Sequence, residues 1–267
     1  MKRVIFVIVA VLTLASLVLA SCGNNATTVT ATATQTTTAT ATTTVAAKIQ
    51  IATDATWPPF EYVNTDTNEI VGFDIDLMTA IAEKENLNIE FVNVGWDPLL
   101  AGMAQGTYEA AISSITITED RQKDMLFSNP YYAAGQIITV AKNNTTITGK
   151  NTLTGKVAAQ LGTTGAIEVE KMSGVTLRTY DEIGLAFQDL LNGQIDAVVC
   201  DNPVAVQYVT KNPDKLKTVG TAFTDEFYGI AVSKGNEDLL AKINAGLKKV
   251  LDEGIIKTLE DKWYTAE

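Results

Sequence analysis

The sequence predicts an α/β fold with two lobes and a binding cleft between them. From residue 48 onward, apolar strand patterns alternate with amphipathic helix patterns, which is typical of mainly parallel sheets with helices packed on them. This alternation occurs in two series, and polar loops follow the strands of each. Because ligands of open α/β sheets bind beyond the carboxyl ends of the strands, two such series predict a cleft between two lobes.

The first series contains three predicted strands and two predicted helices. In chain order we expect the strand 48–53, the helix 74–85, the strand 89–94, a helix that ends at Gly106, and the strand 108–112. Asp97 and Pro98 are expected as the N-cap and first residue of the second helix. Pro58 and Pro59 exclude regular structure in 54–62, so we expect a rigid loop that presents Asp54 and Trp57.

The second series begins after Pro130. We expect strands at 136–141, 156–160, 175–179, 195–200, 216–219 and 227–232, and helices that end near Met172, Asn192, Leu251 and Trp263. Four polar loops then lie at the predicted cleft, namely 54–57, 113–121, 162–165 and 201–203.

The loop 113–121 is the most informative of the four. Thr118 is expected as the N-cap of a helix, with Glu119 and Asp120 in the first turn, where the helix dipole favours acids. Arg121 lies in the same turn, where a cation is disfavoured, so another group is expected to hold it. A guanidinium beside hydroxyls and free backbone N–H groups can bind a carboxylate through two oxygens at once. The alternative is a solvated surface arginine after an ordinary turn.

Composition narrows the function classes. Apolar residues make up 46% of the chain, so it can bury a large core. The net charge is −11 and no Lys/Arg-rich patch stands out, which argues against a nucleic-acid partner. The chain has no histidine, which excludes His-dependent catalysis and metal sites built on His. We expect no metal and no cofactor.

Residues 1–22 have the pattern of an export signal. Lys2 and Arg3 precede a nearly unbroken apolar run that ends in small residues and Cys22. The ending Leu-Ala-Ser-Cys resembles the lipobox of bacterial lipoproteins, which implies cleavage before Cys22 and attachment of a lipid to its thiol. We therefore expect an extracytoplasmic protein, lipid-anchored to the outer face of the cell membrane. The alternative is a retained transmembrane anchor, for which the run is short.

Residues 23–47 are expected to form a disordered tether. They carry no charge and are dominated by Thr and Ala, a composition that cannot bury a core. As a flexible coil they would span roughly 25–30 Å on average. After lipidation only Cys200 would remain as a free thiol, so no intramolecular disulfide is expected and the core must stabilise the protein.

Four motifs in the globular part identify a family. They are Asp-Ala-Thr-Trp-Pro-Pro-Phe at 54–60, Val-Gly-Phe-Asp-Ile-Asp-Leu at 71–77, Ile-Thr-Ile-Thr-Glu-Asp-Arg at 115–121, and Phe-Ser-Asn-Pro-Tyr-Tyr at 127–132. Together they resemble the polar amino-acid-binding proteins of bacterial ABC importers, such as the glutamine-binding and the histidine or lysine-arginine-ornithine-binding proteins. The resemblance extends from about Lys48 to Tyr264.

This resemblance implies a two-lobed clamshell with two crossover strands at the hinge, which closes around a ligand in the cleft. Lobe 1 would comprise 48–130 plus 229–267, and lobe 2 would comprise 136–223. The hinge would comprise 131–135 and 224–228. We expect a monomer that binds a free L-amino acid and delivers it to the transmembrane subunits of an ABC permease.

The resemblance also implies roles for the ligand-binding residues. The α-carboxylate would be held by Ser114, Thr116 and Arg121 with help from Thr163 and Thr164, and the expected set is completed by Ser113. Asp201 would bind the α-ammonium. Trp57 and Trp96 would sandwich the ligand, and Asp54 would reach towards its side chain.

Two positions depart from the glutamine-binding relative. Gln160, also expected at the ligand, stands where that protein has Lys, and Cys200 stands where it has His. These departures argue against a strict glutamine binder.

Each candidate also has a purely structural interpretation. Asp201 could build a turn before Asn-Pro, and Asp54 could cap its local turn. Trp57 and Trp96 could be core aromatics. The segment 162–165 could bind an anion, although it lacks the Lys and spacing of a P-loop. Cys200 is expected to be a small buried hydrophobe.

The sequence favours a non-enzymatic binding protein for a basic amino acid, with arginine first and then lysine or histidine. Two indoles attract a cation strongly, and Asp54 offers it a carboxylate. Glutamine is the alternative ligand, because its amide could pair with Asp54 and Gln160. The enzymatic alternative is a cyclohexadienyl dehydratase, a class that resembles this family and would need a cleft carboxylic acid with a raised pKa.

Overall fold

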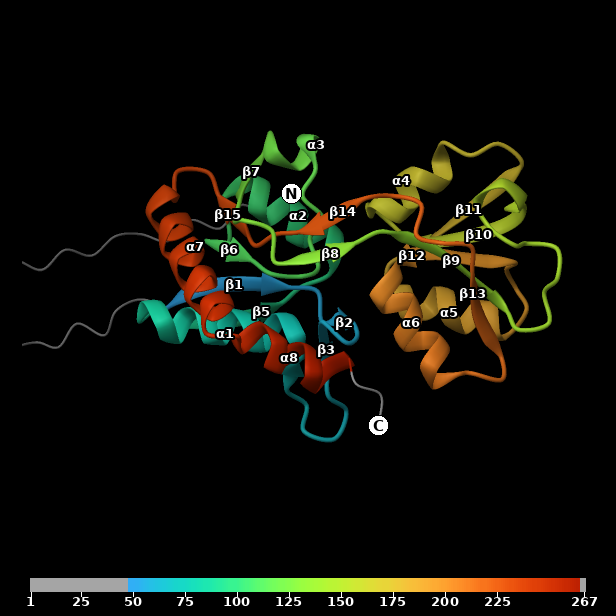
Figure 1. The fold of residues 1–267 in the computed structure, drawn as a ribbon. Coiled ribbons are helices and arrows are strands. Elements are labelled where there is room, and N and C mark those ends of the chain that lie inside the picture. Colours follow the sequence, from blue (N-terminus) through green and yellow to red (C-terminus); the bar gives the residue numbers. More distant parts are fainter. Residues whose placement is uncertain (1–47, 265–267) are drawn as a thin grey trace, which may run out of the picture. The chain divides into compact units, whose positions relative to one another are not determined.

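The computed structural model describes residues 48–264. It contains two lobes, each built on one five-stranded sheet with helices packed against it (Figure 1). The predicted signal 1–22 with Cys22 and the predicted tether 23–47 lie outside the described residues. Within 48–264, no helix combines the length and the apolar character needed to cross a membrane.

Lobe 1 has the strand order β5-β1-β6-β15-β7. The strands β1 (Ile49–Thr53), β5 (Ile89–Asn93) and β6 (Ala110–Ala111) are parallel, whereas β15 (Ala231–Ser233) runs antiparallel to β6 and to β7 (Met125–Phe127). Its helices are α1 (Phe73–Glu85), α2 (Trp96–Gln105), α3 (Glu119–Gln122), α7 (Glu237–Asp252) and α8 (Ile255–Tyr264). The helices α1, α7 and α8 pack against one another.

Lobe 2 has the strand order β11-β10-β12-β9-β13. Its strands are β9 (Gln136–Ala141), β10 (Gly155–Gln160), β11 (Val175–Tyr180), β12 (Ala197–Asp201) and β13 (Leu216–Val219). Its helices are α4 (Thr164–Glu170), α5 (Ile183–Leu191) and α6 (Asn202–Lys211), with a 3₁₀ turn η1 at Lys150–Thr152. Here β10, β11 and β12 are parallel, whereas β9 is antiparallel to β12 and β13.

Both faces of the lobe 2 sheet are covered. Along β12, Val199 belongs to the same apolar cluster as Val169 of α4, whereas Val198 belongs to the cluster that contains Phe187 of α5. Alternate side chains of a strand point to opposite faces, so this central strand is apolar from Ala197 to Cys200, as expected for a sheet covered on both sides. Cys200 is buried in this strand, as predicted.

Two crossover strands join the lobes, which confirms that part of the predicted fold. They are β8 (Tyr132–Ala134) and β14 (Glu226–Tyr228), which pair antiparallel (Figure 1). The exact lobe and hinge boundaries proposed from the sequence stay predictions.

The interpretation of 54–62 as a loop without strands was wrong. The strands β2 (Thr56–Trp57), β3 (Glu61–Val63) and β4 (Ile70–Val71) form a small antiparallel sheet. Pro58 and Pro59 lie in the turn between β2 and β3, where their missing N–H groups cost no ladder hydrogen bond.

The predicted strand 227–232 is two strands in different sheets. The chain pairs with β8 up to Tyr228 and with β6 and β7 from Ala231. Gly229 lies between them, and a Cβ there would come within 2.8 Å of the Ile117 side chain. The close approach at this glycine lets the chain pass from the crossover into the lobe 1 sheet.

The sequence also missed α6 and misplaced the start of α2. The segment 202–211 is rich in β-branched residues, which lowers its helix propensity, but Pro203 suits the first turn of a helix. Helix α2 has Gly95 as its N-cap, so Asp97 lies in the first turn instead. The strand β7 was missed as well, since a run of three residues has no readable period.

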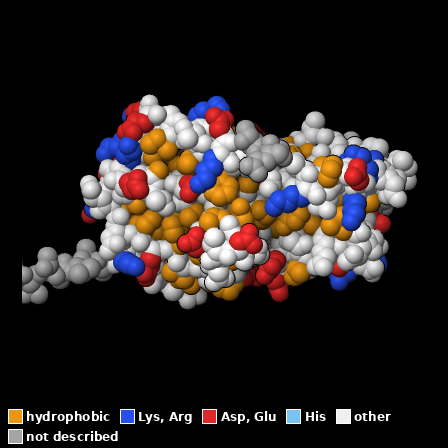
Figure 2. Space-filling model, turned by 90° about the horizontal axis from the view of Figure 1, so that it is seen from below, with side chains coloured by type: hydrophobic (Ala, Val, Ile, Leu, Met, Phe, Trp, Pro, Cys, Tyr) orange, Lys and Arg blue, Asp and Glu red, His pale blue; other side chains and the backbone are white. Residues whose placement is uncertain are grey.

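Charged side chains of both signs are scattered over the face shown in Figure 2, with apolar side chains between them. On this face Lys and Arg form no single broad patch. Single exposed apolar residues such as Val206 and Phe227 are usual on protein surfaces.

Candidate functional site

The predicted site residues gather at the carboxyl ends of parallel strands from both lobes. Asp54 follows β1 and Ser113 follows β6, whereas Gln160 ends β10 and Asp201 ends β12. One cavity brings most of the set together, lined by Trp57, Trp96, Ser113, Ser114, Thr116, Arg121, Thr163, Thr164 and Asp201. Asp54 and Gln160 are not among the lining residues, although both bond to each other beside Trp57.

The cavity is small. It offers about 10 Å³ to the centre of a water molecule, which is room for about one water. The lining side chains must therefore separate before a molecule as large as an amino acid can enter.

The predicted helix start around Arg121 is confirmed. The Thr118 hydroxyl accepts a hydrogen bond from the Arg121 backbone N–H (3.1 Å), so Thr118 is the N-cap of α3. The guanidinium donates to the Thr116 carbonyl (2.8 Å) and, across the cleft, to the Gly162 carbonyl (3.4 Å). These two hydrogen bonds hold the Arg121 cation in the first turn of the helix.

Arg121 also stacks on an indole. Its guanidinium carbon lies 5.0 Å from the ring centroid of Trp96, which is cation–π geometry. Burial lowers the pKa of Arg121 to about 10, against the opposing effect of Asp201 and Glu226. The Trp96 indole nitrogen is buried without a hydrogen-bond partner.

Trp57, Asp54 and Gln160 form the second part of the site. The Gln160 amide donates to Asp54 Oδ2 (2.9 Å) and to the Asp181 carbonyl (2.9 Å), and its oxygen accepts from the Trp57 indole N–H. Burial raises the pKa of Asp54 above its usual value. Trp57 and Trp96 each belong to an apolar cluster while also lining the cavity, so the core and binding interpretations are compatible.

Asp201 is buried at the N-cap position of α6, but its side chain makes no cap hydrogen bond. It accepts from the Gln136 amide at 2.5 Å instead. Burial, followed by the nearby Glu226 carboxylate, raises the pKa of Asp201 to about 7. This carboxylate is therefore available to a cation in the cavity and is not used by the local backbone.

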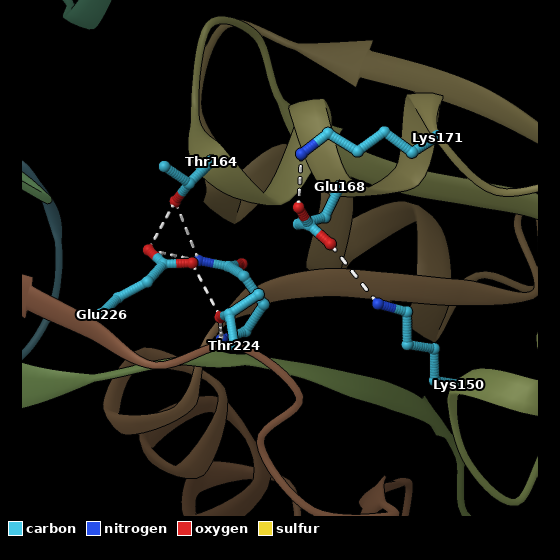
Figure 3. A network of polar contacts seen from close by, with 7 residues as sticks. Lys150, Thr164, Glu168, Lys171, Thr224 and Glu226 are labelled. Atoms are coloured by element: carbon cyan, nitrogen blue, oxygen red, sulfur yellow. Dashed lines mark hydrogen bonds and ion pairs between the residues drawn. The ribbon is translucent and has the colours of Figure 1, made fainter. Parts of the chain in front are cut away.

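Thr163 and Thr164 differ in what their hydroxyls do. Thr163 caps α4 by accepting from the Ala166 N–H (3.3 Å) and donates to the Gln160 carbonyl (2.7 Å). Thr164 directs its hydroxyl towards Glu226 instead (Figure 3).

Glu226 is a site residue that sequence reasoning missed. This buried carboxylate on β14 accepts from Thr116 of lobe 1 (2.9 Å), from Thr164 of lobe 2 (2.8 Å) and from Thr224 (2.7 Å). Figure 3 shows Glu226 between Thr164 and Thr224, while Glu168 pairs separately with lysines at the surface. The only signal was its position in the predicted crossover 224–228, because no motif marks it. Glu226 places a negative charge where both lobes and the crossover meet.

Comparison with known proteins identifies the family. Residues 49–266 match the bacterial extracellular solute-binding proteins, family 3. A probable histidine-binding protein of Neisseria gonorrhoeae is 34% identical over 224 residues, covering 82% of this chain and 83% of that protein. A putative ABC transporter arginine-binding protein 2 of Escherichia coli (strain K12) is 36% identical over 226 residues, covering 82% of this chain and 91% of that protein.

Solved structures extend the comparison to the fold. An ancestral arginine-binding protein bound to arginine is 41% identical with a TM-score of 0.78, covering 81% of this chain and 98% of that chain. An ancestral arginine-binding protein bound to glutamine is 41% identical with a TM-score of 0.77, covering 82% of this chain and 98% of that chain. The chain described here therefore belongs to family 3 of the bacterial extracellular solute-binding proteins.

Proposed function

We propose that this protein binds a free basic L-amino acid, arginine first and then lysine or histidine, and delivers it to the permease of an ABC importer. One observation carries the choice of a basic ligand. Three buried carboxylates, Asp54, Asp201 and Glu226, lie in or beside the cavity, whose lining contains one cation, Arg121. A ligand with an extra positive charge offsets this excess, whereas an acidic ligand adds to it.

The roles follow from the chemistry of each group. Arg121 would hold the α-carboxylate, because a guanidinium can bind both of its oxygens. The Ser114 and Thr116 hydroxyls donate to Glu61 and Glu226 in the structure and would turn from them to the α-carboxylate when the ligand enters. Asp201 would hold the α-ammonium. The ligand's guanidinium would extend between the indoles towards Asp54 and displace the Gln160 amide from it.

A thermal-shift panel over the twenty amino acids tests the proposal. Arginine should raise the melting temperature most, because a ligand that binds only the native state stabilises it by mass action. Glutamate and aspartate should stabilise least, since Asp54 would face a like charge. Strongest stabilisation by glutamate would contradict the proposal.

Glutamine is the second candidate ligand. The Gln160 amide already satisfies Asp54 in the structure, and the amide of a bound glutamine could take over that role. In the same panel, a larger shift with glutamine than with arginine would select this alternative.

We further propose that the protein acts as a monomer without catalysis, anchored outside the cytoplasm by a lipid on Cys22. Two observations support the absence of catalysis, and a third supports the lipid anchor. The relatives reported above are named as binding proteins, Asp54 is already paired with Gln160 and Thr56, and the sequence 19–22 resembles a lipobox. An assay with prephenate-like acids tests the dehydratase alternative, and intact mass of the membrane-extracted protein tests the lipid.

A further inference from the structure

Two buried acids lie directly behind the Ser113–Ser114 turn. Glu61 comes from β3 and Asp74 from the first turn of α1, and neither has any exposed surface. Both carboxyl groups bond to Ser114, which places them close to each other. Asp74 belongs to the motif 71–77, to which no role in the binding site has been assigned.

Both acids hold the turn. Asp74 Oδ2 accepts from the Ser114 backbone N–H (2.8 Å) and from the Tyr131 hydroxyl (2.8 Å). The two Glu61 oxygens accept from the Ser113 and Ser114 hydroxyls, each at 3.3 Å. The Ser113 hydroxyl in turn accepts from the Asp54 N–H (2.9 Å), which ties the turn to the end of β1.

The turn has a backbone conformation that needs such support. Ser114 has φ 48°, in the left-handed region that residues other than glycine seldom adopt. Conformations of this kind persist only where the surroundings hold them, and they cluster at ligand sites. The hydrogen bond from the Ser114 N–H to Asp74 is a direct means of holding it.

The pair is expected to keep one proton. Asp74 Oδ1 is buried without a hydrogen-bond partner, and two buried carboxylates that lie close together cannot both ionise without strong repulsion. The other titratable groups that act on the pair are Asp54 and the hydroxyls of Tyr131, Tyr228 and Tyr264. These groups contribute no positive charge that would stabilise a second anion.

The pKa values of both acids are shifted upwards, which also favours a retained proton. Burial and the neighbouring Asp74 raise the pKa of Glu61 well above its usual value, and burial raises the pKa of Asp74 to about 6. The stronger upward shift at Glu61 favours retention of the pair's proton on that residue.

We propose that Glu61 and Asp74 are positioning residues for ligand binding: as a pair that shares one proton, they hold the Ser113–Ser114 turn in its left-handed conformation against the cavity. This rests on the proposed function only in that Ser114 contacts the ligand's α-carboxylate. The retained proton matters because a second negative charge behind the turn would repel that carboxylate.

Two matched variants separate the roles of shape and charge. Glu61→Gln replaces the protonated acid with a neutral amide that keeps one of the two oxygens that accept from the serines, so arginine affinity at pH 7 should fall by less than it does when Asp74 is removed. Asp74→Ala removes the acceptor of the Ser114 N–H, and affinity should fall by about tenfold or more. Asp74→Leu, which also removes the acceptor but nearly keeps the side-chain volume, covers the case in which Asp74→Ala fails to fold.

A purely structural role of Glu61 and Asp74 would not change how arginine affinity depends on pH, so the pH profile tests the shared proton. As pH rises above 7, the wild-type affinity for arginine should fall more than that of Glu61→Gln, because only wild type has a Glu61 proton to lose. Deprotonation of the ligand's ammonium affects both proteins equally and cancels in the comparison. Parallel profiles for the two proteins would contradict the shared proton.

Amide hydrogen exchange of unliganded protein separates this inference from the proposed function. Exchange at 113–116 should be faster in Asp74→Ala, or in Asp74→Leu if the alanine variant fails to fold, than in wild type, whatever the ligand is. If wild type does not bind arginine, the proposed ligand is wrong, but the hydrogen-exchange test of the turn can still be carried out. Unchanged exchange in the Asp74 variant, together with wild-type affinity, would overturn the positioning role.

Discussion

The Gln160 amide donates to Asp54 Oδ2 over 2.9 Å and thereby joins the end of β10 in lobe 2 to the end of β1 in lobe 1. Its oxygen accepts from the Trp57 indole on the same side of the site. A neutral amide thus partners a buried carboxylate at the position proposed for the far end of the ligand. A cationic ligand group would make a stronger, charge-assisted bond to the same carboxylate.

Asp54→Asn should therefore weaken arginine binding far more than glutamine binding. A hydrogen bond to a charged group contributes about 1.5–3 kcal/mol, so we expect roughly a tenfold to 150-fold loss for arginine and less than about fivefold for glutamine. Titration calorimetry with both ligands measures the two losses. Equal losses would show that no charge pair forms at Asp54.

Gln160→Lys tests the same contact from the other lobe. The new ammonium would neutralise Asp54 and repel a basic side chain, so arginine affinity should fall while glutamate affinity rises. Gln160→Met, which removes the amide without adding charge, is the matched control. An unchanged ligand preference in Gln160→Lys would place the ligand side chain elsewhere.

Arg121→Ala should abolish measurable binding of every α-amino acid. It removes the charged partner of the α-carboxylate inside a nearly dry cavity, and breaking such a pair costs about 2–5 kcal/mol. Arg121→Lys keeps the charge but loses the planar stack on Trp96, so it should recover only part of the affinity. Circular dichroism checks the fold, and near-native affinity of folded Arg121→Ala would refute the assignment.

Binding should release a proton below pH 7. The pKa of Asp201 is raised to about 7 by burial and by Glu226, and a bound ammonium favours the ionised carboxylate. Affinity should therefore increase as pH rises from 5.5 to 7 and then level off. Calorimetry at pH 6 in two buffers of different ionisation enthalpy counts the released protons.

Glu226→Gln is the control for that pH dependence. It removes the negative charge that helps to raise the pKa of Asp201, so the midpoint of the affinity profile should move to lower pH. The shape of the side chain and its bonds to Thr116 and Thr164 are largely kept. An unmoved midpoint would mean that Asp201 is not the titrating group.

The same buried acids should make the unliganded protein less stable as pH rises from about 4 to 7. The folded-state pKa values of Asp74 and Asp201 are raised to about 6 and about 7 from an ordinary value of 3.8. In that interval the folded state binds more protons than the unfolded state, so the free energy of unfolding falls with rising pH. Urea titrations should show a smaller fall in Asp201→Asn, and identical slopes would contradict the raised pKa.

Local patterns were sufficient for much of this protein. The alternation of strand and helix predicted the α/β fold, and the loops after the strands predicted where Ser113, Thr163 and Asp201 would gather. Thr118 was predicted as an N-cap, because capping depends on residues within one turn. These features could be read from the sequence because each depends on neighbours close along the chain.

The remaining features depend on residues far apart in the sequence. Glu226 reaches Thr116 from 110 residues away, and Gln160 reaches Asp54 across 106. The strands β2 and β3 were missed because tertiary packing, and not strand propensity, stabilises such short segments. The folded chain brings Glu61, Asp74 and Ser114 together, and only this contact decides which buried acid gains a hydrogen-bond partner and which keeps its proton. The sequence could not predict this, because burial and neighbouring charge are properties of the tertiary structure.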